Sequence, residues 1–337
     1  VKATPALLRK LNVNAVSLAN NHIMDYGEPG LSDTMRYLSQ SGISLFGAGS
    51  DNALALSPLA VNLKVGSAVT ELRVGQRGVA ANSAPCSACY FCRRDLENLC
   101  ENLLFNNGAY AEYIRIPSRI VAKNTYTIPD HVDYKDAALV EPLACVLRGV
   151  EETGIRPEDN VAVLGLGPIG LMFVRMAKVY GARVIAVGRR QSQLERAARM
   201  GAEKVIEVSD STDPVRVVRQ LTGNRGVDVA IEAVGTPTTW ETALQMVRRG
   251  GTVNFFGGCP SGSRLTLDTS LMHYSEITCR ASFHHTPAHI RRALEIVSEG
   301  NVTARDFVNN EEPLANLLDV MRSMMSHNGH LKTAIIP

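Results

Sequence analysis

Residues 160–190 constrain the fold more than any other stretch of the chain. They read NVAVLGLGPIGLMFVRMAKVYGARVIAVGRR: a short apolar run, a glycine-rich turn, a helical pattern and a second apolar run. Strand, glycine turn, helix and strand in this order are typical of a unit that binds a dinucleotide. Glycine-rich turns also occur for structural reasons alone, but the flanking strand and helix patterns favour the dinucleotide.

The residues of this turn have separate predicted roles. Gly165 permits a tight bend, Gly167 lets the backbone approach a pyrophosphate, and Gly170 lets the helix pack closely against the strand. The N–H groups at the start of the helix then face the anion. We therefore predict cofactor contacts at Gly165, Gly167, Pro168, Ile169 and Gly170.

The residue after the second strand selects the nicotinamide cofactor. An acidic side chain there would hold a ribose 2′-hydroxyl, whereas a small residue followed by arginine accommodates a 2′-phosphate. The strand ends in Gly188-Arg189-Arg190, without an acid. This favours NADP over NAD, with two solvated arginines at the start of a surface helix, or use of both cofactors, as the alternatives.

Strand and helix patterns continue to alternate after this unit. Helices are predicted over 191–200, 214–221, 237–247 and 288–299, and strands over 204–207, 227–232, 252–256 and 276–282. Repeated strand-helix units of this length predict a doubly wound parallel sheet, with the ligand at the carboxyl ends of the strands. The predicted class is α/β, and we expect this Rossmann domain to hold six strands over 146–282.

Composition narrows the possible partners. The formal net charge of the 337 residues is only +2, so nucleic acid is not an expected partner. No apolar run approaches the roughly 20 residues that span a bilayer, and the first residues show no signal-peptide pattern. We therefore expect a cytoplasmic protein with no membrane partner.

Four of the seven cysteines crowd into one segment. Cys86, Cys89 and Cys92 follow one another at two-residue spacings, and Cys100 comes shortly after. Four thiolates on a looped backbone can close the shell of one structural Zn²⁺. An iron–sulfur centre or free thiols are the alternatives, and the clustering disfavours disulfides.

The first 60 residues have a different character. They predict helix 4–11, strand 15–18, helix 31–41 and strand 44–46, with Asn21 and His22 in the polar turn. The run SLANNHIMDYGEPGLSDTMRYLSQSGISLFGAG resembles the metallophosphoesterases of capsule and poly-glutamate synthesis. That resemblance implies metal ligation by Asn21 and His22, but the family's other ligands have no counterpart here. A hydrogen-bonded turn, without phosphatase activity, is therefore the favoured interpretation.

From about residue 65 onward the chain resembles the zinc-dependent medium-chain dehydrogenases, and among them the polyol, sorbitol and threonine dehydrogenase branch. The four-cysteine lobe and the glycine turn carry the resemblance, with GAYAEY at 108–113, ALVEPLAC at 138–145, GGTV at 250–253 and HLKTA at 330–334. It implies NAD(P)-linked oxidation of a secondary hydroxyl group in a small alcohol or polyol. It also implies a homo-oligomer, either a dimer or a tetramer.

The resemblance also implies a domain organisation. Residues 1–62 form the phosphoesterase-like fragment, 63–145 an incomplete GroES-like antiparallel barrel with its zinc lobe at 86–100, and 146–282 the Rossmann domain. Residues 283–337 add a helix and return to the catalytic domain. A strand-helix-strand fragment cannot supply antiparallel partners in the barrel's register, so we expect the first 60 residues to dock loosely and to contribute no barrel strand.

Further site residues follow from the resemblance. Glu141 corresponds to a glutamate beside the catalytic zinc, as ligand or near neighbour, although it could merely cap a helix. Cofactor contacts are also predicted at Val234, Gly257 and Gly258. His284 and His285 are expected to belong to the inherited cleft or a subunit edge rather than to replace missing ligands.

The family's other catalytic ligands, a Cys and a His-Glu pair, should precede the four-cysteine lobe. No cysteine precedes Cys86, and His22 is the only histidine there. We therefore predict that no second histidine or cysteine lies near Glu141 other than by coincidence, with Cys145, one helical turn along, as the nearest thiol. The alternative to an active dehydrogenase is a catalytically impaired, zinc-stabilised dinucleotide-binding protein, either a fusion or a truncated product.

Overall fold

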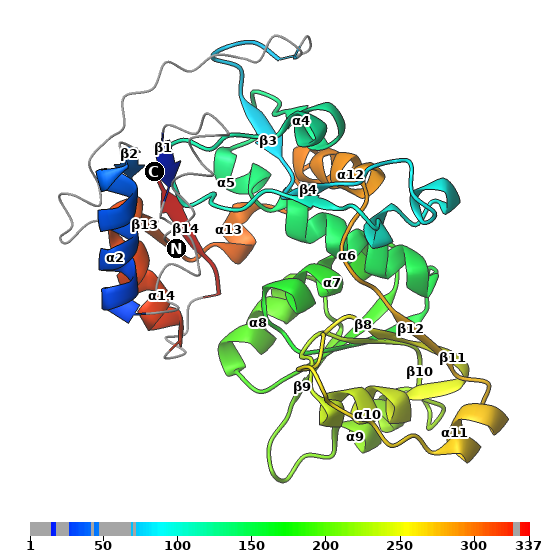
Figure 1. Ribbon diagram of the computed structural model, residues 1–337. Coiled ribbons are helices and arrows are strands. Elements are labelled where there is room, and N and C mark those ends of the chain that lie inside the picture. The colour runs from blue at the N-terminus through cyan, green and yellow to red at the C-terminus, as the bar shows by residue number, and fades with distance from the viewer. Residues whose placement is uncertain (1–14, 18–26, 42–43, 47–68, 70–71, 326–330) are drawn as a thin grey trace. The chain divides into compact units, whose positions relative to one another are not determined.

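The computed structural model describes residues 15–17, 27–41, 44–46, 69, 72–325 and 331–337 (Figure 1). The chain divides into two compact units. One comprises Val1–Gln76, Leu104–Ala122 and Val308–Pro337, and the other comprises Arg77–Leu103 and Lys123–Phe307. The domain boundaries suggested by the sequence stay a prediction.

A six-stranded sheet organises the second unit. Its strands are β7 (Asn160–Leu164), β8 (Arg183–Gly188), β9 (Lys204–Glu207), β10 (Val227–Glu232), β11 (Val247–Phe255) and β12 (Thr278–Ala281). They lie in the order β12-β11-β10-β7-β8-β9, and all neighbours are parallel. The predicted six-stranded parallel sheet is confirmed. The direction of winding reverses between β7 and β10, which is where doubly wound folds bind their ligands.

Helices cover both faces of this sheet (Figure 1). They are α6 (Val140–Thr153), α7 (Pro168–Val179), α8 (Gln191–Arg199), α9 (Pro214–Leu221), α10 (Pro237–Met246), α11 (Thr269–Tyr274) and α12 (Pro287–Ser298). Local sequence sets their starts. The Asp213 carboxylate accepts bonds from two N–H groups of the first turn of α9, and Thr236 forms a capping box with Thr239 at α10.

The core lies between the sheet and its helices. Residues Val161, Ala162 and Val163 of β7 are fully buried, as expected for a strand with helices on both faces. Trp240 stacks on Phe255, with ring centroids 4.0 Å apart. Burying side chains of this size contributes roughly 1.5–3 kcal/mol each, so packing fixes the sheet edge that carries the candidate site.

The rest of this unit contains short elements. β3 (Gly78–Ala80) pairs antiparallel with β6 (Thr125–Thr127). The unit also includes β4 (Ser83–Ala84), the 3₁₀ turns η1 (Cys92–Arg94) and η2 (Glu97–Leu99), and the helices α5 (Tyr134–Ala137) and α13 (Ala304–Phe307). Helix α4 (Ser118–Asn124) precedes β6. A two-stranded antiparallel pair agrees with the incomplete barrel that the sequence suggests.

The first unit contains two small parallel pairs. β1 (Ala15–Ser17) pairs with β2 (Ser44–Phe46), with helix α2 (Gly27–Gln40) between them in the chain. β13 (Asn310–Pro313) pairs with β14 (Thr333–Ile336), and η3 (Leu314–Asn316) and α14 (Leu317–Met325) lie between them in sequence. β5 (Leu104–Phe105) also belongs here.

The predictions for the first 60 residues have mixed outcomes. Strand 44–46 is confirmed, residues 15–17 of the predicted strand 15–18 are confirmed while residue 18 lies outside the described residues, and the helix includes Gly27 rather than beginning at residue 31. Among the described strands, β1 and β2 pair only with each other, as expected for a segment that supplies no barrel strand. Helix 4–11, Asn21 and His22 lie outside the described residues.

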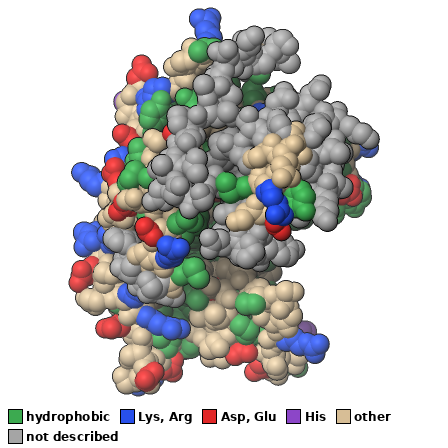
Figure 2. Space-filling view, turned by 60° about the vertical axis from the view of Figure 1, so that its left-hand side comes forward, with side chains coloured by type: hydrophobic (Ala, Val, Ile, Leu, Met, Phe, Trp, Pro, Cys, Tyr) green, Lys and Arg blue, Asp and Glu red, His purple; other side chains and the backbone are tan. Residues whose placement is uncertain are grey.

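Charges of both signs are interspersed on the face drawn in Figure 2, in keeping with the small net charge. Within the described ranges, no helix is both long and apolar enough to span a bilayer.

Candidate dinucleotide site and metal centres

The glycine turn between β7 and α7 has the geometry that its sequence predicts. Gly165 has φ +92°, and a Cβ added there would lie 2.5 Å from Val234 Cγ2. A Cβ at Gly170 would lie 1.7 Å from the Gly165 carbonyl oxygen, so the helix approaches the strand as closely as a glycine allows. A Cβ at Gly167 would meet nothing within 4 Å. The turn is tight on its inner side and open at the start of α7.

The strand register gathers the predicted cofactor residues at one edge of the sheet. Leu164 of β7 pairs with Val187 of β8 and Glu232 of β10, and Glu232 pairs with Phe255 of β11. The residues that follow these strand ends therefore share the carboxyl edge. They include Gly165, Gly188, Arg189, Val234, Gly257 and Gly258.

Glu232 shapes this edge, and it was missed by the sequence interpretation. Its carboxylate is fully buried and accepts hydrogen bonds from the N–H groups of Val234 (2.8 Å) and Gly235 (2.9 Å). A Cβ at Gly257 would lie 2.7 Å from Glu232 Oε2, and Trp240 Nε1 donates to the Gly257 carbonyl at 3.0 Å. The loops after β10 and β11 are thus fixed together. An acidic residue ending an apolar strand was the signal available in the sequence.

Strand β8 ends in a compact turn that is followed by two arginine residues. A Cβ at Gly188 would lie 2.8 Å from Leu166 Cδ1, so this glycine packs on the residue between Gly165 and Gly167. Arg189 and Arg190 are both exposed, and α8 begins directly after them. Both residues follow β8 directly at the carboxyl edge, and the Gly188-Arg189-Arg190 turn contains no acidic residue.

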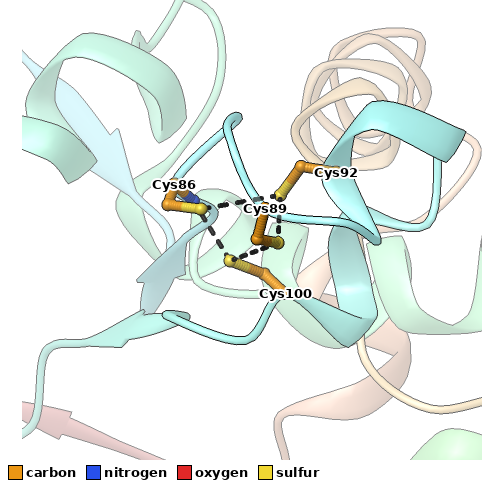
Figure 3. Close-up of side chains that lie close together, drawn as sticks. All are labelled: Cys86, Cys89, Cys92 and Cys100. Atoms are coloured by element: carbon orange, nitrogen blue, oxygen red, sulfur yellow. Dashed lines mark hydrogen bonds between the residues drawn. The ribbon is translucent and has the colours of Figure 1, made fainter.

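The four cysteine sulfurs come together, as their spacing predicts (Figure 3). Sγ–Sγ distances are 3.5 Å for Cys89–Cys92, 3.9 Å for Cys89–Cys100 and 4.0 Å for Cys86–Cys92. Tetrahedral Zn²⁺ with Zn–S bonds of about 2.3 Å places sulfurs roughly 3.8 Å apart, so these three separations fit a structural zinc, and all four sulfurs lie within 4.8 Å of one another. Backbone N–H groups of Cys86 and Asn102 donate to Cys100 Sγ.

The thiols of this lobe differ in their tendency to ionise. A hydrogen bond from the Cys92 backbone lowers the pKa of Cys89 to about 6, and backbone N–H groups of Ala88 and Cys89 lower that of Cys86. Burial raises the pKa of Cys92 to about 12. Four neighbouring thiolates repel one another, and a bound cation is what allows all four to be charged at once.

A second cluster of metal-ligating side chains lies elsewhere in the same unit. Glu141, His284 and His285 each offer one ligand atom, and these atoms all lie within 4.8 Å of one another. Glu141 is in the first turn of α6, whereas the histidines follow β12. The prediction that no second histidine lies near Glu141 is wrong, because the fold brings the chain after β12 against α6. Cys145 does lie one turn along, with Sγ 3.8 Å from Glu141 Oε1.

Hydrogen bonds orient this second cluster. Asn82 Nδ2 donates to Glu141 Oε1 at 3.1 Å, and Asn82 Oδ1 lies 3.2 Å from His285 Nε2. Ser83 Oγ lies 2.6 Å from His284 Nε2. Burial lowers the pKa of His285 to about 3 and also lowers that of His284, which favours the neutral form of both imidazoles. Burial, and then the charge of Glu141, raises the pKa of the Cys145 thiol.

The turn that carries the two histidines is fixed from several sides. The Phe283 carbonyl accepts hydrogen bonds from Arg148 Nη1 of α6 (2.6 Å) and from Asn98 Nδ2 of the cysteine lobe (3.2 Å). His284 has φ +66°, an uncommon backbone conformation for a residue other than glycine. The two imidazole centroids lie 4.0 Å apart. The sequence interpretation missed Asn98, because nothing local indicates its distant partner.

Known protein families match this chain in three segments. The zinc-binding dehydrogenase family matches residues 168–299, and the alcohol dehydrogenase GroES-like domain matches residues 60–130. The bacterial capsule synthesis protein PGA_cap matches residues 2–88. The two resemblances seen in the sequence are thereby confirmed.

Curated relatives and solved structures agree. Sorbitol dehydrogenase of Bacillus subtilis is 31% identical over 280 residues, covering 81% of this chain and 77% of the relative. D-xylulose reductase A of Aspergillus oryzae is 30% identical, covering 73% of this chain and 69% of the relative. The chain belongs to the zinc-binding dehydrogenase family, whose members depend on zinc and NAD(P).

Two solved structures extend the comparison. Alcohol dehydrogenase TADH from a Thermus species has a TM-score of 0.74 at 29% identity, covering 81% of this chain and 80% of that one. A zinc-binding dehydrogenase from Sinorhizobium meliloti, bound to NADP, has a TM-score of 0.74 at 30% identity with the same coverage. The α/β class with a Rossmann sheet and a GroES-like part is confirmed.

Proposed function

We propose that the chain binds NADP or NAD at the carboxyl edge of its sheet. We propose that the reaction it serves is the oxidation of a secondary alcohol group of a polyol. The observation that carries the proposal is the Gly165–Gly170 turn, which is closed on the strand side and open at Gly167, at the switch point between β7 and β10. Sorbitol dehydrogenase and D-xylulose reductase A among the relatives support a polyol as the substrate class.

Each part of the dinucleotide has a proposed partner. The first N–H groups of α7, with Gly165, Gly167, Pro168, Ile169 and Gly170, take the pyrophosphate. Gly188, Arg189 and Arg190 take the adenosine ribose, and the two exposed guanidinium groups favour the 2′-phosphate of NADP. Val234, Gly257 and Gly258, whose loops are fixed by Glu232 and Trp240, take the nicotinamide half.

The remaining proposed roles concern zinc and the substrate. Cys86, Cys89, Cys92 and Cys100 hold the structural zinc. Glu141 lies beside the reacting alcohol, oriented by Asn82. A zinc ion at such a place stabilises negative charge on the alcohol oxygen. With cofactor and alcohol bound, the nicotinamide would accept a hydride from the alcohol carbon, and the hydroxyl proton would leave to a neighbouring base or to solvent.

The finer assignments rest on the resemblance. We propose a homo-oligomer, either dimer or tetramer, in the cytoplasm. Residues Thr278–Ala281 of the edge strand β12 are exposed, which is compatible with pairing to a second copy.

A second candidate is a zinc-stabilised dinucleotide-binding protein with impaired catalysis. The observation that favours it is the absence of cysteine before Cys86, where the family's first catalytic ligand is expected. Under this candidate, cofactor binds, polyol oxidation is slight, and adding the family's upstream Cys and His-Glu segment restores turnover.

The test uses Gly167, whose φ of −67° suits any residue and whose Cβ position is open. Gly167→Val should fold normally and weaken NADP binding by about tenfold or more, because the side chain occupies the place of the pyrophosphate. Isothermal titration with NADP and NAD measures the change, and the melting temperature controls for folding. Unchanged NADP affinity would contradict the proposed site. Turnover of sorbitol and xylitol by the unmodified chain then separates the two candidates.

A further inference from the structure

We propose that Glu141, His284 and His285 form a second metal site that binds one Zn²⁺, separate from the four-cysteine lobe. Its chemical use rests on the proposed function, but binding of the ion does not require cofactor or substrate. The family's first catalytic ligand, a cysteine before the lobe, has no counterpart in this sequence. In the proposed site, ligands from two distant segments of the chain take its place.

The donor set is suited to zinc. Two imidazoles and one carboxylate are an established ligand set for Zn²⁺, and three protein ligands leave a fourth position open, as in catalytic rather than structural sites. Ligand atoms around tetrahedral Zn²⁺ at about 2.1 Å lie roughly 3.4 Å apart. The three groups already lie within 4.8 Å of one another. Closing around an ion therefore requires the ligand atoms to approach one another by at most about 1.4 Å.

His285 provides independent support for a ligand. It is 2% exposed, its Nε2 lies 3.2 Å from Asn82 Oδ1, and its Nδ1 has no hydrogen-bond partner within the part of the chain that the structure describes. Buried polar atoms in proteins are normally satisfied. The nitrogen that faces the cluster is Nε2, which lies 3.7 Å from Glu141 Oε1, so an ion would bind there beside the Asn82 contact, while the unpaired Nδ1 shows that the hydrogen-bonding capacity of this buried ring is not fully used.

The surroundings hold the ligands in place before an ion binds. Ser83 Oγ contacts His284 Nε2, and Asn82 bridges Glu141 and His285. Arg148 and Asn98 fix the carbonyl of Phe283, the residue before the pair. Ligands that are placed in advance lose less conformational entropy on binding, so a three-residue site can retain zinc.

In the experiment, the full chain is first treated mildly with chelator, so that only its cysteine lobe keeps zinc. Zn²⁺, and in a separate sample Co²⁺, is then titrated into the protein. We expect one further ion per chain, and cobalt d–d absorption without a strong thiolate charge-transfer band. His285→Ala and Glu141→Gln should each weaken binding by about 100-fold, and Asn82→Ala by about tenfold or more. His273→Ala, an exposed histidine on α11, is the matched control and should leave binding unchanged.

Several results would overturn the metal site. One such result is that the unmodified chain binds no further Zn²⁺ or Co²⁺. Another is that His285→Ala, Glu141→Gln or Asn82→Ala keeps the melting temperature of the parent and also its affinity for the metal ion. Asn82→Ala keeps all three ligands, so it tests the site even if His285→Ala fails to fold. NADP titration of the same samples separates the two proposals: NADP binding without a second ion refutes only the metal site, and a second ion without NADP binding refutes only the proposed function.

Discussion

The two ligand clusters of this protein are built in opposite ways. Cys86, Cys89, Cys92 and Cys100 come from one short segment, and their spacing alone predicts that they converge. Glu141 and the pair His284-His285 come from α6 and from the turn after β12, and only the folded sheet brings them together. A site made by local spacing can be recognised in sequence, whereas a site made by topology cannot.

The clusters also differ in what they can do. Four sulfurs complete a tetrahedral shell, so the lobe is suited to holding structure. Glu141, His284 and His285 leave a position open, so that cluster is suited to chemistry. Asn98 lies between the last two cysteines of the lobe and donates to Phe283, which connects the two clusters physically.

The largest expected effect is the loss of a lobe ligand. Cys100→Ser should abolish zinc retention by the lobe and destabilise the protein by about 3 kcal/mol or more, because structural zinc contributes directly to folding. Cys279→Ser replaces an exposed cysteine outside the lobe and should change little. Zinc analysis and calorimetry measure both variants. A zinc-retaining Cys100→Ser protein with normal stability would show that the lobe is not a four-ligand site.

A smaller effect is expected from strain at the glycine turn. Gly165→Ala should lower stability by about 2 kcal/mol, because φ +92° is unfavourable for alanine and its Cβ would collide with Val234. Denaturant unfolding measures the change. Gly167→Val should lose cofactor affinity without this loss of stability, so equal destabilisation of the two variants would contradict the division of roles within the turn.

The link between the clusters gives the next prediction. Asn98→Ala should leave the lobe zinc in place but weaken the second site by several-fold to tenfold, since it removes one of the donors that fix Phe283. Its own cost in stability should be about 1 kcal/mol. Cobalt titration against the parent protein measures the change in affinity. An Asn98→Ala protein that loses the lobe zinc instead would show that Asn98 acts within the lobe alone.

The smallest effect concerns a region remote from both clusters. Burial tends to raise the pKa of Asp228, but hydrogen bonds from the Asn160 N–H and from Arg248 outweigh it, so the pKa lies below its ordinary value of 3.8. A depressed carboxyl pKa stabilises the fold above the unfolded pKa, and this contribution is lost as pH falls through the folded one.

Asp228→Asn should therefore destabilise the protein at neutral pH and reduce the loss of stability in acid below about pH 4. Denaturant unfolding from pH 7 downward measures both. Metal binding by the two clusters should stay unchanged at pH 7. A parallel shift of the whole stability curve, with the same acid dependence as the parent, would show that Asp228 is not the group responsible.

The sequence predicted those features that depend on local pattern. Alternating apolar runs identified all six strands, and glycine positions identified the turn whose crowding at Gly165 and Gly170 the structure explains. It missed Glu232, because the acid at the end of an apolar strand was visible in the sequence but its hydrogen bonds to the Val234 and Gly235 N–H groups were not. It did not predict that His284 and His285 lie near Glu141, since their approach depends on how β12 and α6 pack.

The most direct test of the account is the zinc stoichiometry of the full chain, measured by native mass spectrometry along a series of chelator concentrations. The account predicts two zinc ions per chain, with the first lost at low chelator and the second, in the cysteine lobe, retained until the protein unfolds. His285→Ala should begin at one ion and Cys100→Ser should lose the tightly held one. A single zinc ion at every chelator concentration, unaffected by His285→Ala, would contradict the account.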